Sequence, residues 1–160
     1  MTENKSISLD ASQRELAKIS NHRVWDLLDK PDRSPGESEE MLQAAYASLY
    51  HWTKVGTGVH IQRAYWLLTK VYISLGKASD AVDQAVKCQE LTEKHPGEMK
   101  DFDLAYAQEA LARAYALSGD LERAKDHFET TEKLGHAIKD NEDRTIFQAD
   151  LISGDWYGIK

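Results

Sequence analysis

The stretch Ser48–Trp52 reads SLYHW and places a phenol and an imidazole side by side, at Tyr50 and His51. Both groups can move protons, so this stretch could carry general acid–base chemistry. Helical spacing instead assigns half of it to a buried apolar stripe, Leu42, Ala45, Leu49 and Trp52. His51 would then point nearly opposite the stripe, to be solvated or to contact the next helical pair. A small pocket around Tyr50 and His51, serving an enzyme or a sensor of a small molecule, stays as the alternative.

The other reactive side chains give weaker patterns. The six histidines form neither an HExxH motif nor a close pair with ligand spacing, so we expect no metal site. Asp103 and Glu109 would lie about 120° apart around a helix, which does not favour a catalytic pair. Cys88 is expected to be a buried, inert thiol. The sequence therefore assigns no catalytic residue and no cofactor.

Composition limits the classes of partner. The 160 residues carry a formal net charge of −7, which argues against general affinity for nucleic acid or anionic membranes. No window approaches the roughly 18 apolar residues that span a bilayer. The start, MTENKSISLD, has no apolar run typical of a signal peptide, and one cysteine cannot close an internal disulfide. We expect a cytoplasmic protein.

The elements that must position these residues read as helices throughout. Apolar periodicity predicts segments at about 9–30, from Ser34 to beyond Trp52, and at about 58–75, 78–94, 101–118, 120–138 and 140–152. The first has a stripe of Leu16, Val24 and Leu27, and the second opens with a capping box from Ser34 to Glu37 around Pro35. The prediction is an all-α fold of six or seven helices.

Two of these helical pairs repeat one another. With a constant offset of 43 residues, a set of five positions recurs: Leu68, Tyr72, Gly76, Ala81 and Ala85 fall on Leu111, Tyr115, Gly119, Ala124 and Phe128. Tyrosine fills space between paired helices, glycine permits a sharp turn, and alanine permits a close approach. One unit cannot cover its own apolar face, so we expect the units to stack.

At these residues the chain resembles the tetratricopeptide repeat family, and the whole length looks like small bacterial members with no assigned function. The resemblance covers residues 62–94 and 105–137 and implies a right-handed stack of antiparallel helix pairs. It implies one domain over residues 1–153, in which the first two helices form a degenerate pair.

The resemblance also implies a function, namely binding of a protein or peptide in a concave groove, without catalysis. The ligand-facing positions of that family fall here on Arg63, Trp66, Lys70, Ile73, Tyr106, Glu109, Arg113 and Ala116. Their aromatic and cationic side chains suit an acidic or carboxylate-ended peptide. The alternative is that Glu109 and Arg113 only pair with each other at the surface, while Trp66 packs on the second segment, which begins at Ser34.

The last residues, 154–160, form an aromatic tail. Trp156, Tyr157 and Ile159 would make an exposed apolar cluster if the tail hung in water. We expect Trp156 and Tyr157 either to fold back on the helices or to insert into a second copy, which would give a homodimer.

Overall fold

The computed structural model describes residues 8–160; residues 1–7, which make up most of the MTENKSISLD segment considered above for a signal peptide, lie outside the described residues. The described chain consists of helices and contains no strand, which confirms the all-α prediction. The elements are α1 (Leu9–Leu28), α2 (Pro35–Val55), α3 (Gly58–Ser74), α4 (Ala78–Lys94), the short 3-10 helix η1 (Pro96–Glu98), α5 (Asp101–Ser118), α6 (Leu121–His136) and α7 (Asn141–Ile152).

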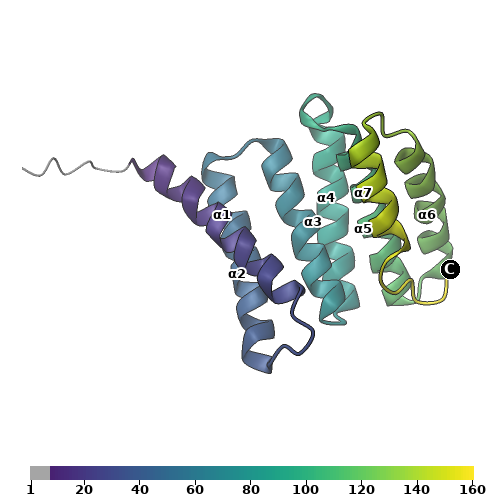
Figure 1. Cartoon of the computed structure of the whole chain (residues 1–160), viewed down its shortest axis with the longest axis horizontal. Coiled ribbons are helices and arrows are strands. Elements are labelled where there is room, and N and C mark those ends of the chain that lie inside the picture. Colours follow the sequence, from purple (N-terminus) through teal and green to yellow (C-terminus); the bar gives the residue numbers. More distant parts are fainter. Residues whose placement is uncertain (1–7) are drawn as a thin grey trace, which may run out of the picture.

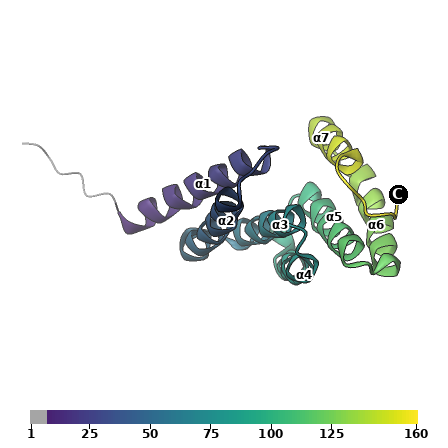
Figure 2. The same ribbon diagram turned by 90° about the horizontal axis from the view of Figure 1, so that it is seen from below.

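The helices pack in successive pairs, α1 with α2, α3 with α4, and α5 with α6, and α7 lies on α5 and α6 (Figure 1). Viewed from below, the stack is an arc whose inner side is formed by α1, α3, α5 and α7, while α2, α4 and α6 lie outside (Figure 2). The inner helices also contact one another directly, α1 with α3, α3 with α5 and α5 with α7. The first helix of each pair therefore faces the concave side.

Two apolar cores hold the arc together. The larger one joins α1 to α5 and includes Leu27, Met41, Leu68 and Val71, each at most 1% exposed. The smaller one lies around Phe147 and Trp156 at the far end. The predicted stripe of the first helix is wrong at Leu16, which is 46% exposed. Its neighbour Ala17 is fully buried instead.

The two matching units share the same turn geometry. Gly76 and Gly119 both adopt positive φ, at 69° and 85°. After each turn a backbone N–H reaches back to the repeat tyrosine, from Lys77 to the Tyr72 carbonyl (2.9 Å) and from Asp120 to the Tyr115 carbonyl (3.1 Å). These bonds satisfy carbonyls at the helix end, and glycine reaches positive φ at low steric cost.

The C-terminal tail folds back on its own chain, one of the two outcomes expected for it. Trp156 is 5% exposed, and its indole N–H donates to the Leu151 carbonyl (2.9 Å). Its ring packs edge-on against Phe128 of α6, at 4.8 Å between ring centroids. Tyr157 is only half-buried. The tail thus covers the side of α6 that would otherwise end the stack.

Candidate functional site

Two adjoining pockets run along the inner side of the arc. The first, of about 370 Å³, lies among α1, α3, α5 and the tail, and the second, of about 350 Å³, lies among α1, α3, α5 and α7. They share Trp25 and Trp66, and we call them together the groove. Seven predicted ligand-facing residues line it: Arg63, Trp66, Lys70, Ile73, Tyr106, Glu109 and Arg113. Ala116 is buried and lines neither pocket.

A row of aromatic rings crosses the groove, with one ring from each inner helix. The centroid distances are 5.9 Å from Trp25 to Trp66, 5.4 Å from Trp66 to Tyr106, and 4.8 Å from Tyr106 to Phe147. Phe147 is buried, whereas the other three rings are half-buried and line the pockets. Sequence reasoning missed Trp25. Its position directly after the buried Val24, beside the apolar stripe, was the available signal.

Arg63 is paired with a buried carboxylate, although its own side chain is 44% exposed. Its guanidinium donates two hydrogen bonds to the carboxylate of Asp103, at 2.8 and 2.9 Å. Asp103 is 3% exposed and also accepts the backbone N–H of Lys100 (2.9 Å) at the start of α5. A two-bond pairing of this kind fixes both side chains, so Arg63 joins α3 to α5.

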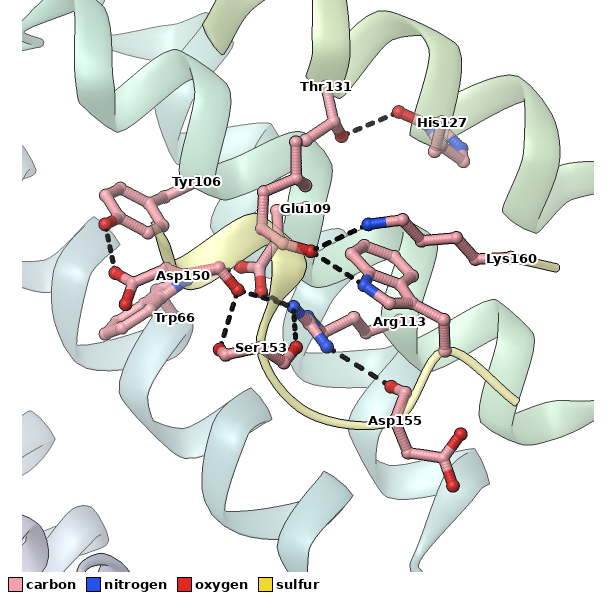
Figure 3. A network of polar contacts seen from close by, with 12 residues as sticks. Trp66, Tyr106, Glu109, Arg113, His127, Thr131, Asp150, Ser153, Asp155 and Lys160 are labelled. Atoms are coloured by element: carbon pink, nitrogen blue, oxygen red, sulfur yellow. Dashed lines mark hydrogen bonds and ion pairs between the residues drawn. The ribbon is translucent and has the colours of Figure 1, made fainter. Parts of the chain in front are cut away.

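Arg113 forms its hydrogen bonds with other residues of the same chain (Figure 3). It is 8% exposed, and its Nε donates to the buried carboxylate of Glu109 at 2.5 Å. The remaining nitrogens donate to tail and α7 carbonyls, those of Asp150 (2.9 Å), Ser153 (2.9 Å) and Asp155 (3.2 Å). Its guanidinium also lies 3.9 Å from the centre of the Trp156 ring. Arg113 therefore holds the tail against α5.

Two further contacts connect this network to the aromatic row. The indole N–H of Trp66 donates to Glu109 Oε2 at 3.4 Å. The hydroxyl of Tyr106 donates to Asp150 of α7. Burial, and then the nearby Asp150 carboxylate, raise the pKa of Tyr106 well above its usual value, so its phenol stays neutral. These rings are thus held in fixed orientations.

The charged side chains of the groove that have no ion-pair partner among the described residues are mostly negative. Asp29, Asp150 and Asp155 are exposed and form no ion pair with any residue of the described range 8–160. Lys70 also lacks a carboxylate partner there, and its ammonium lies 5.7 Å from the centre of the Trp66 ring. The predicted positions alone suggested an excess of cations. The carboxylates of Asp29, Asp150 and Asp155, which the repeat positions do not include, give the groove an excess of negative charge instead.

Tyr50 and His51, the alternative site, line none of the three pockets described here. Tyr50 is 55% exposed, and the His51 ring contacts the Gln13 side chain of α1. Neither residue lines the groove or a third, smaller pocket of about 200 Å³ among α1, α2 and α3. His51 is half-buried, and the helix it contacts is α1, the partner of α2 in the first pair, rather than a helix of the next pair.

The remaining candidates are the thiol of Cys88 and a metal site. Cys88 is fully buried, and burial raises the pKa of its thiol, which disfavours the nucleophilic thiolate. Between residues 8 and 160, no three histidine, cysteine or acidic side chains gather where they could hold a metal ion. No helix in that range has the length and apolarity needed to cross a bilayer.

The groove is therefore a concave surface built from paired charges and an aromatic row. Comparisons with models of protein families, with curated proteins and with solved structures returned no match.

Proposed function

We propose that this protein is a non-enzymatic binding module whose groove holds a segment of a partner protein. The observation that carries the proposal is the aromatic row, in which Trp25, Trp66 and Tyr106 remain half-buried while lining a concave surface. Large, rigid aromatic side chains in concave sites dominate the energetics of protein interfaces. In this proposal the chain is a cytoplasmic, right-handed helical repeat of the tetratricopeptide kind.

The state of the charged groups supports binding rather than turnover. The buried carboxylates in the groove, Asp103 and Glu109, are held by Arg63 and Arg113. A general acid or base exchanges a proton with its substrate through a free carboxylate oxygen, and hydrogen bonds from the two guanidinium groups occupy oxygens of both these carboxylates. The same pairs give the groove fixed walls, which lowers the entropic cost of binding.

The test uses a library of random seven-residue peptides displayed on phage and selected on the wild-type protein. Selected peptides are then synthesised with a fluorophore, and their dissociation constants are measured by fluorescence anisotropy. Trp66→Ala should weaken binding by about tenfold or more, as expected for an aromatic anchor. Circular dichroism at the temperature of the binding measurement verifies that the variant is folded.

Tyr50→Ala is the matched control, because Tyr50 is an aromatic side chain that is open to solvent but lies outside the groove. It should leave the dissociation constants unchanged. Peptides that bind folded Trp66→Ala as tightly as wild type, or that depend on Tyr50, would refute the proposal.

A further inference from the structure

The first pocket has a negative rim. Asp29, directly after α1, and Asp155 in the tail both line it, and both are exposed. Ser74, the last residue of α3, lines it too; α3 has no basic residue in its last turn, and the C-terminal end of a helix carries a partial negative charge. Lys70 is the only basic side chain lining this pocket without a carboxylate partner in the described chain. An incoming cation therefore meets more attraction than repulsion.

Large apolar and aromatic side chains make up much of the wall of the second pocket. It is lined by the shared tryptophans and by other large side chains, Leu67, Phe102 and Tyr106. Gln62 lines it as well, and its side-chain oxygen is buried with no donor among the described residues. Asp150 supplies a further exposed carboxylate. The pocket thus offers space for a large apolar side chain, together with acceptors but no unpaired cation.

The whole groove counts five carboxylates, Asp29, Asp103, Glu109, Asp150 and Asp155, against three basic side chains, Arg63, Lys70 and Arg113. Because Arg63 and Arg113 are matched by Asp103 and Glu109, the free charges are three carboxylates and one ammonium. An acidic ligand would have to approach this excess of negative charge, with Lys70 alone to receive it. Charge complementarity therefore favours a basic ligand.

We infer that the groove selects a segment of a partner protein in which a lysine or arginine lies next to a large apolar side chain. The cation enters the first pocket between Asp29 and Asp155, and the apolar side chain enters the second. Trp25 and Trp66, which border both pockets, lie between the two side chains. This inference rests on the proposed function and adds the chemistry of the ligand.

The experiment sequences the peptides selected from the same phage library and measures their binding to charge variants of the groove. Selected peptides should be enriched in lysine or arginine beside phenylalanine, leucine or tryptophan. Asp29→Asn and Asp155→Asn should each weaken them about two- to fivefold, in the range of exposed ion pairs, and the loss should shrink at high salt. Lys70→Gln should strengthen binding by a similar factor, because it removes the opposing charge.

Asp26→Asn is the matched control, since Asp26 is exposed in the last turn of α1, just before Asp29, but does not line the groove. It changes the net charge equally and should leave binding unchanged. Selected peptides that are acidic or uncharged, or that lose affinity for Lys70→Gln, would overturn the inference while the Trp66 dependence keeps the proposed function. If no selected peptide depends on Trp66, both fail.

Discussion

The two matching units have the same turn but present different surfaces. The unit of α3 and α4 places Trp66 and Lys70 toward an open groove. At the equivalent positions, 43 residues later, the unit of α5 and α6 has Glu109 and Arg113, which are 5% and 8% exposed. The difference comes from the neighbouring segments: α5 packs beside the first unit, while α7 and the tail cover the second.

Repeat position alone therefore does not decide what a side chain does. A cation on the inner face is available to a ligand where that face stays open. Where a later segment covers it, the same position becomes a buried anchor, as Arg113 does for the tail. Variants that change one unit and spare the other test this difference.

Removing the anchor should have the largest effect. Arg113→Ala leaves the buried carboxylate of Glu109 without its partner and frees the carbonyls of the tail, so we expect the free energy of unfolding to fall by about 3–5 kcal/mol. Lys70→Ala at the equivalent position should change it by less than about 0.5 kcal/mol. Urea denaturation measures both. Similar losses in the two variants would contradict the distinction between the units.

Gly135 offers the next test, since the first unit has Thr92 at the equivalent position. A Cβ on Gly135 would lie only 2.4 Å from Cε1 of Phe147, so α7 needs glycine there to pack closely on α6. Gly135→Ala should destabilise the protein by about 1–3 kcal/mol despite the better helix propensity of alanine. Gly36→Ala in α2, whose Cβ would come no closer than 3.9 Å to Ser34 Oγ, should be neutral or stabilising in the same denaturation assay.

The turn glycines test the part that the units share. Both Gly76 and Gly119 have positive φ, and a Cβ at either would meet no atom within 4 Å. Alanine at each should therefore cost about 1–2 kcal/mol from backbone strain alone, and asparagine less. Thermal unfolding of the two alanine variants should give the same shift. A large difference would mean that the two turns are not equivalent.

The smallest expected effect is a dependence of the free energy of unfolding on pH. His127 of α6 lies where the first unit has Gln84. Burial is the main cause that lowers the pKa of His127 from 6.5, and its ring stacks on Tyr115 and bonds to Gln108. The unfolded chain then binds this proton more readily than the folded one. Stability should fall as the pH drops from 6.5 through the lowered pKa.

His127→Gln, which copies the first unit, should flatten this dependence in urea titrations taken at several pH values. His22→Gln, which removes an exposed histidine of α1, is the control and should leave the slope as it is in wild type. Equal slopes in wild type and His127→Gln would show that His127 does not couple to folding.

Much of the helical framework could be predicted because its ends are marked by specific residues. The predicted segment 78–94 matches α4 (Ala78–Lys94), and Ser34 caps α2 with the capping box that the sequence predicts. The seven groove residues also lie together, because the spacing that makes a helix repeat also aligns its inner face. Whether they bind a ligand stays a prediction.

The composition of the groove could not be predicted from the repeat. Trp25 belongs to the helix pair that lacks the repeat residues, and Asp155 comes from the tail, so no spacing rule relates either to Trp66. Leu16 was misplaced for a related reason. As the first inner helix, α1 has neighbours on one side only, so part of its apolar surface stays exposed and periodicity does not show which part.

The aromatic row has an optical consequence. The Trp25 and Trp66 rings lie 5.9 Å apart at a tilt of 35°, an arrangement in which the electronic transitions of two indoles couple. Trp156 has a separate environment beneath the Arg113 guanidinium. A molecule that parts the first two rings changes their coupled near-ultraviolet dichroism, whereas release of the tail changes the fluorescence of Trp156. The chain therefore carries two intrinsic reporters, one for its groove and one for the segment that closes the stack.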